Sequence, residues 1–81
     1  MKARVYVSFK STVLDPQGQT IRSALAGLGY RGISEIRQGK FFEISLDAGA
    51  NRAQSQKDID TIAREVLTNP VIEEYRVEFL D

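Results

Sequence analysis

One short stretch decides how this chain begins to fold: Lys10-Ser11-Thr12-Val13-Leu14-Asp15-Pro16-Gln17-Gly18. Before it, apolar and polar residues alternate from Ala3 to Phe9, which is the period-2 pattern of a strand with one buried face. Within it, Asp15 predicts a helix N-cap and Pro16 the first helical residue, because proline tolerates that position and aspartate accepts bonds from free helix amides. We therefore expect a strand, a tight turn and a helix.

Two segments carry apolar residues at positions i, i+3, i+4 and i+7, which is the stripe of a helix with one buried face. The first predicts a helix over Pro16–Leu28, and Gly29 is suited to end it. The second predicts a helix over 56–68, with Ser55 as its N-cap and Asn69-Pro70 as its end. Ala48–Gln54 is polar and small, and we expect it to be a loop.

The remaining segments have the composition of strands. Ile33–Gln38 and Phe41–Asp47 predict an antiparallel pair, joined by a hairpin at Gly39-Lys40, and Val71–Leu80 predicts a last strand. The order βαββαβ favours a single α+β domain over residues 1–81. We expect a two-layer ferredoxin-like sandwich, with a four-stranded antiparallel sheet and both helices on one face. The opposite face would then be open for self-association, through Tyr6, Phe41 and Leu80.

The composition excludes several classes of function. Among 81 residues there is no cysteine and no histidine, so a Ser/His/Asp triad, a Cys/His pair and a zinc site of nitrogen and sulfur ligands are excluded. Eleven basic and eleven acidic residues are interspersed, which argues against a polyanion partner such as nucleic acid. No apolar run has the roughly 20 residues of a membrane span, and we expect a cytoplasmic protein. We predict no catalytic, cofactor-binding or metal-binding residue.

Three local patterns suggest chemistry, and each has a simpler structural explanation. Gly27–Gly32 approximates a phosphate-binding loop but follows a helix, whereas such loops precede one. Arg37–Ile44 approximates part of an RNA-recognition motif, but Phe41 and Phe42 are adjacent and must face opposite sides of a strand. The carboxylate pairs Asp58 with Asp60 and Glu73 with Glu74 are spaced so that their side chains diverge.

Several segments, in order, resemble the PurS family of small subunits of phosphoribosylformylglycinamidine (FGAM) synthase. They are Val5-Tyr6-Val7-Ser8, Val13-Leu14-Asp15-Pro16-Gln17-Gly18, Ala24-Leu25-x-x-Leu28-Gly29, Ile36-Arg37-x-Gly39-Lys40 and Leu67-x-Asn69-Pro70-Val71-Ile72-Glu73-Glu74-Tyr75. The resemblance covers almost the whole chain, and only Ala48–Gln54 shows no family pattern.

The resemblance implies a place in de novo purine biosynthesis, in a complex with a large synthetase subunit and a glutaminase subunit. That complex converts FGAR, ATP, glutamine and water into FGAM, ADP, phosphate and glutamate. The resemblance also implies that the small subunit is not the catalyst, that it helps the other two assemble and transfer ammonia, and that ATP and Mg bind at the large subunit. We expect no cofactor on this chain itself.

Self-association is expected as well, as a homodimer or a higher even oligomer, because a small core with one uncovered sheet face gains stability from a second copy. Partner contacts are expected at the turn and the hairpin, where apolar and cationic side chains lie on loops. The residues concerned are Val13, Leu14, Asp15, Pro16, Gly18, Arg37, Gly39 and Lys40.

Other classes remain open from the sequence. A ligand-sensing regulatory module of the ACT type and a small RNA-binding domain share the expected element order. An acylphosphatase is a further possibility, but the loop from Ser11 to Pro16 offers neither the glycine-rich cradle nor the arginine that such an enzyme needs.

Overall fold

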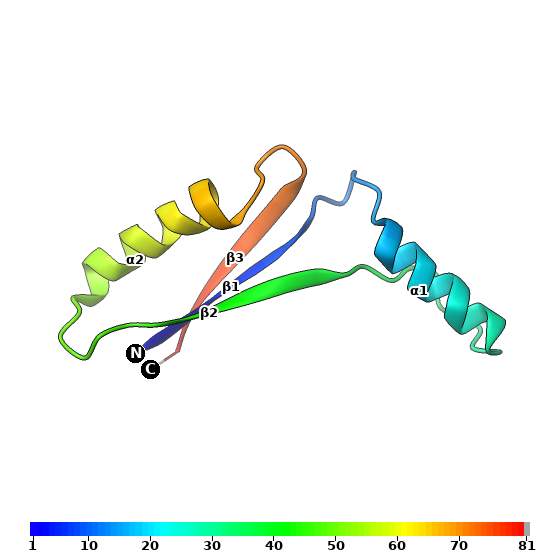
Figure 1. Cartoon of the computed structure of the whole chain (residues 1–81), viewed down its shortest axis with the longest axis horizontal. Helices are drawn as coiled ribbons and strands as arrows, with labels where there is room; N and C mark the ends of the chain where they lie inside the picture. Colours follow the sequence, from blue (N-terminus) through cyan, green and yellow to red (C-terminus); the bar gives the residue numbers. More distant parts are fainter. Residues whose placement is uncertain (81) are drawn as a thin grey trace.

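A three-stranded antiparallel sheet and two helices make up the fold, described for residues 1–80 in a computed structural model (Figure 1). The sheet has the order β2-β1-β3, so the first strand lies in the middle. The elements in chain order are β1 (Lys2–Phe9), α1 (Pro16–Gly27), β2 (Gly39–Ser45), α2 (Arg52–Ile62) with a π-helical turn (Ala63–Leu67), and β3 (Glu73–Leu80).

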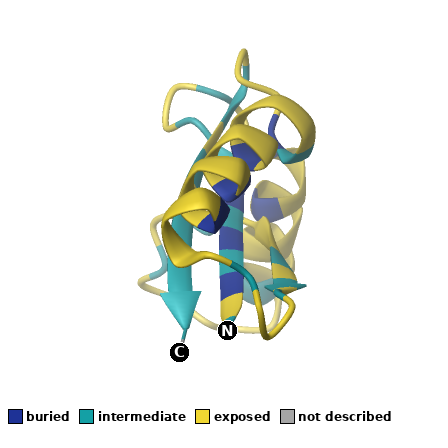
Figure 2. Ribbon diagram, turned by 90° about the vertical axis from the view of Figure 1, so that its left-hand side faces the viewer, coloured by how far each residue is buried: buried dark blue, intermediate teal, exposed yellow. Residues whose placement is uncertain are grey.

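The core lies between β1 and α2. Ala3, Val5 and Val7 of β1 are fully buried together with Ile59 and Ala63, as the dark blue segments of Figure 2 show. These positions are among those that the alternation in 3–9 and the second helical stripe predict to be buried, but the same stripe includes Ile62 and Val66, which are 38% and 73% exposed. Half-buried apolar residues of β2 and β3 extend this core: Phe42, Ile44, Tyr75, Val77 and Phe79.

The second helix begins earlier than the sequence predicts. Asn51 is its N-cap, and its side-chain oxygen accepts a hydrogen bond from the amide of Gln54 at 2.9 Å. The prediction of Ser55 as the cap was wrong: Ser55 is buried inside the helix. Asparagine and serine are almost equally good caps, and the good helix formers that precede Ser55 allow the helix to start one turn sooner.

The first helix does not cover the sheet. α1 and residues 28–38, which return to β2, form an arm that projects from one end of the sheet (Figure 1). No residue of α1 belongs to the buried core. The molecule measures 52 × 26 × 14 Å, with a radius of gyration of 16.4 Å. A compact chain of this length would have about 12 Å, so the arm accounts for an elongated molecule.

The predictions of a four-stranded sheet, of a hairpin at Gly39-Lys40 and of two helices on one sheet face were therefore wrong. Ile33–Gln38 belongs to the irregular return segment of the arm, and no strand of the described residues pairs with it. Gly39 and Lys40 begin β2, opposite Ser8 and Val7 of β1. An alternating pattern predicts an extended segment, but it does not say which other strand will supply its hydrogen bonds.

No helix within residues 1–80 is both long enough and apolar enough to cross a membrane.

Candidate functional site

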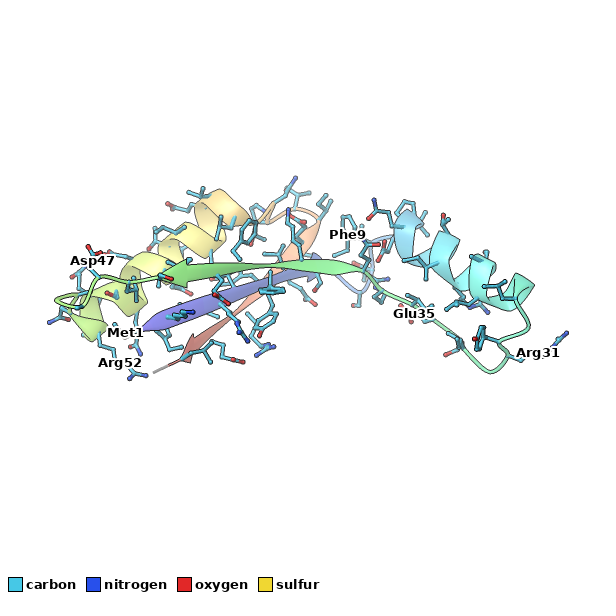
Figure 3. All side chains as sticks on the ribbon, turned by 60° about the horizontal axis from the view of Figure 1, so that its bottom comes forward. Met1, Phe9, Arg31, Glu35, Asp47 and Arg52 are labelled. Atoms are coloured by element: carbon cyan, nitrogen blue, oxygen red, sulfur yellow. The ribbon has the colours of Figure 1, made fainter. Side chains whose placement is uncertain are left out.

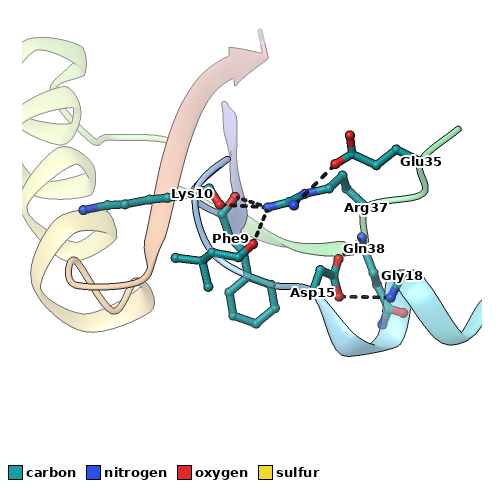
Figure 4. A network of polar contacts seen from close by, with 8 residues as sticks. Phe9, Lys10, Asp15, Gly18, Glu35, Arg37 and Gln38 are labelled. Atoms are coloured by element: carbon teal, nitrogen blue, oxygen red, sulfur yellow. Dashed lines mark hydrogen bonds and ion pairs between the residues drawn. The ribbon is translucent and has the colours of Figure 1, made fainter.

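The junction between the sheet and the arm brings together most of the residues that the sequence singles out for partner binding. Arg37 is at its centre (Figure 4). Its Nη2 donates hydrogen bonds to the carbonyl oxygens of Lys10 at 2.8 Å and Val13 at 3.1 Å, and a longer one to that of Phe9 at 3.4 Å. Its Nη1 lies 3.4 Å from a carboxylate oxygen of Glu35. The guanidinium thus fastens the return segment to the turn after β1.

Asp15 also connects α1 to the return segment, through two hydrogen bonds. Its carboxylate accepts a hydrogen bond from the amide of Gly18 at 3.0 Å, which caps α1, and another from the amide of Gln38 at 2.6 Å, which holds the start of β2 (Figure 4). These two amides, with the nearby charge of Arg37, hold the pKa of Asp15 below its usual value. The predicted N-cap is confirmed, and the same side chain also positions the arm.

Two glycines of the junction are required by close packing. A Cβ on Gly18 would overlap with the carbonyl oxygen of Ile36, and a Cβ on Gly39 would lie 2.7 Å from the carbonyl oxygen of Val7. Neither residue has the positive φ that favours glycine. Their role is to let backbone segments approach each other.

The predicted partner residues differ in what they expose. Asp15 and Gly18 are buried, and the guanidinium of Arg37 already donates hydrogen bonds to carbonyl oxygens. These three residues therefore have a structural role at the junction. Leu14 is 63% exposed, which leaves its side chain free to bind a partner rather than packed under α1. Val13 is half-buried, and Pro16, Gly39 and Lys40 are exposed. Their contact with a partner stays a prediction.

The residues predicted for self-association lie together on the outer face of the sheet. Tyr6 and Phe41 are opposite each other on β1 and β2, with ring centroids 5.8 Å apart. Leu80 of β3 is opposite Lys2 and so shares that face. Charged groups surround the rings: Arg76 lies 4.3 Å from the Tyr6 centroid, and Glu43 pairs with both Lys2 and Arg4. This face is more polar than the sequence suggests.

Cross-strand pairing also affects the ionisation of this outer face. Hydrogen bonds from Arg4 and the nearby charge of Lys2 lower the pKa of Glu43. Charged and aromatic neighbours at these positions satisfy one another, which suits a face exposed to water.

An uncovered apolar surface on the arm was not expected from the sequence. Ile21 is 41% and Leu28 is 74% exposed, although both belong to the helical stripe that should be buried. We call this surface, with the neighbouring Ala24, the α1 stripe. The periodicity indicates an apolar helix face, but it does not show that the chain's own sheet leaves this face exposed.

Acidic side chains of the described residues do not gather into a metal-binding cluster. No group of three or more aspartate or glutamate side chains within residues 1–80 could hold a metal ion. The paired carboxylates accept hydrogen bonds from other neighbours instead of converging on one point. Asp58 accepts from Gln54, Asp60 accepts from Tyr75, and Glu73 accepts from the amide of Asn69. Gly27–Gly32 follows the C-terminal end of α1, so helix N-terminal amides do not point into it.

The sequence profile of the family described as "PurS: Phosphoribosylformylglycinamidine (FGAM) synthase" matches residues 2–81. A relative from Synechocystis is named phosphoribosylformylglycinamidine synthase subunit PurS. It is 41% identical over 93% of this chain and 74% of its own length. The Bacillus subtilis protein of the same name is 38% identical over 95% of this chain and 89% of its own.

Solved structures agree with the sequence relatives. Bacillus subtilis PurS superposes with a TM-score of 0.82 at 34% identity, over 99% of this chain and 98% of that one. A chain in the structure of PurLQS from Thermotoga maritima superposes with a TM-score of 0.84 at 32% identity, over 98% and 95%. These matches cover nearly the whole of this chain and 74–98% of the compared proteins, and this chain therefore belongs to the PurS family of FGAM synthase.

Proposed function

We propose that this chain is the non-catalytic small subunit of an FGAM synthase complex in de novo purine biosynthesis. In this role it helps a synthetase subunit and a glutaminase subunit assemble, so that ammonia released from glutamine reaches the synthetase. The complex converts FGAR, ATP, glutamine and water into FGAM, ADP, phosphate and glutamate. ATP and Mg bind at the synthetase subunit, and this chain binds neither.

The single observation that carries this proposal is the match to PurS proteins over nearly the full length, including a chain of a PurLQS assembly. The absence of cysteine and histidine supports the non-catalytic part, because the chain has neither the thiol nucleophile nor the imidazole base that glutamine hydrolysis commonly uses. The shape supports the assembly part, since a thin molecule 52 Å long exposes a large surface for its size.

The same proposal includes a homodimer or a higher even oligomer. Its support is the α1 stripe, which remains exposed, together with a return segment that no strand of the described residues pairs with. Exposed apolar surface and unpaired extended backbone both gain from association with a second copy.

Co-purification tests the proposed function. The tagged full chain is expressed and purified together with the synthetase and glutaminase subunits of the same organism. Both subunits are expected to be retained with the tagged chain. A tagged chain that retains neither of them, at concentrations of roughly 10 μM, would contradict the proposal because weak complexes are still populated there.

A further inference from the structure

The far end of the arm carries a shallow cleft that none of the roles above uses. It is lined by Arg22, Ser23 and Ala26 of α1 and by residues 30–33 of the turn that follows; we call it the tip cleft. Figure 3 shows Arg31 at the outermost end of the arm, with its side chain directed away from the sheet. Tyr30 is 62% exposed beside it. An aromatic and an arginine at a projecting tip have the composition of an interface hot spot.

The turn that presents these side chains is firmly specified. Gly29 and Gly32 have φ of 95° and 90°, values that side-chain-bearing residues rarely adopt. The amide of Tyr30 donates to the carbonyl of Leu25 at 3.0 Å, which ties the turn to the end of α1. Arg22 is held too, since its Nε donates to the carbonyl of Ile33 at 3.0 Å. A partner would meet a tip that is already organised, which lowers the entropic cost of binding.

Charge distinguishes the outer part of the arm, residues 16–34, from the rest of the chain; the one acidic residue of the arm, Glu35, lies beyond this part and pairs with Arg37. Residues 16–34 contain two arginines, Arg22 and Arg31, and no acidic residue, which leaves nine basic and eleven acidic residues elsewhere. Arginines of the sheet and of the π-helical turn pair with neighbouring carboxylates, as Arg4, Arg64 and Arg76 do. Neither arginine of the tip cleft has an acidic partner within residues 1–80. The chain has no net charge, but the tip of its arm is cationic because Arg22 and Arg31 have no acidic partner among the described residues.

The tip cleft and the α1 stripe are on different sides of the helix. At 3.6 residues per turn, Ser23 and Ala26 lie roughly 140–160° around the axis from Leu28. A second copy that covers the stripe would therefore leave the cleft accessible to a different protein.

We infer that the tip cleft docks an acidic side chain of a partner subunit in the complex, whose carboxylate is received by Arg31, with Arg22 adding positive charge to the same cleft and Tyr30 packing on apolar surface beside it. Guanidinium groups bind carboxylates through paired hydrogen bonds, and Ser23 offers a further hydroxyl donor. The inference rests on the proposed function, because it takes the partner to be the synthetase or the glutaminase subunit.

The test compares two charge reversals at exposed positions, Arg31→Glu at the tip and Lys57→Glu on α2 at the other end of the molecule. Each full-length variant and the wild type are titrated into the separately purified synthetase and glutaminase subunits. We expect Arg31→Glu to weaken binding to one of them by roughly tenfold or more, and Lys57→Glu to leave both affinities unchanged. Salt raised from about 0.05 M to about 0.5 M should weaken wild-type binding more than that of Arg31→Glu.

Other results are decisive in the opposite direction. Equal binding by wild type and Arg31→Glu would overturn the inference and leave the proposed function intact, whereas a wild type that binds neither subunit would overturn both. A changed sedimentation coefficient of Arg31→Glu alone would assign the tip to contacts between copies. Wild-type binding to a short single-stranded RNA, lost in Arg31→Glu, would assign it to nucleic acid. Melting temperatures equal to the wild type confirm that both variants fold.

Discussion

Glycine at position 18 is required by space, and this defines a sharp test of the junction. A methyl group there would meet the carbonyl oxygen of Ile36 and lie 2.9 Å from an Asp15 carboxylate oxygen. We expect Gly18→Ala to destabilise the chain by about 1–3 kcal/mol, the usual cost of overpacking. Gly27→Ala is the control: it is in the same helix, has open space around it, and should stabilise by about 0.5–1 kcal/mol. Urea unfolding measures both, and equal effects would contradict the packing described here.

The carboxylate of Asp15 makes the stability of the junction depend on pH. Its pKa is lowered in the folded chain by the amides of Gln38 and Gly18, so folding favours the charged carboxylate. Its stabilising effect is therefore complete above the unfolded pKa of about 3.9, and it is lost as the pH falls through the lower folded value. Asp15→Asn should melt at a lower temperature than the wild type at pH 7, and the gap should narrow below about pH 4. A gap that is constant with pH would show that the charge of Asp15 contributes nothing.

At the scale of elements, local sequence patterns predicted the secondary structure well, but they did not predict which strands pair. β1, α1 and β3 are where alternation and helical stripes place them, because the side-chain period alone determines those elements. Ile33–Gln38 has a strand's composition but lies in the return segment, since a strand needs a neighbour and none of the strands in residues 1–80 pairs with it. For the same reason the sequence identifies the apolar stripe of α1, but it does not show that the sheet leaves this stripe exposed. The turn signature in the sequence was enough to identify the junction residues. It did not predict that Arg37 donates hydrogen bonds to carbonyl oxygens.

These uncovered elements lead us to expect self-association. We expect the wild type to sediment as a dimer or a higher even oligomer at micromolar concentration. Leu28→Ser on the α1 stripe and Phe41→Ser on the outer sheet face remove side chains that are 74% and 58% exposed. We expect Leu28→Ser to weaken the oligomer more, because charged residues surround Phe41 and none of the stripe residues is charged. A monodisperse wild-type monomer would refute self-association, and a larger effect of Phe41→Ser would assign it to Tyr6, Phe41 and Leu80.

The molecule as a whole is elongated, with the sheet at one end and the arm at the other. One end is a sheet with a small core under α2, and the other is an arm whose position is set by Asp15, Gly18 and Arg37 (Figure 1). No cluster of acidic side chains within residues 1–80 could hold a metal ion, and both ends of the molecule expose surface that other chains could cover. A sandwich with both helices on the sheet would have been compact, and the length of the molecule is what separates this fold from that expectation.

The most direct measurement of the central claim is FGAM formation by the purified synthetase and glutaminase subunits, with and without this chain, using glutamine or ammonia as the nitrogen source. A non-catalytic assembly subunit should raise the glutamine-dependent rate, leave the ammonia-dependent rate of the synthetase unchanged, and release no glutamate from glutamine on its own. Glutamate release by this chain alone, or a glutamine-dependent rate that is the same without it, would contradict the account.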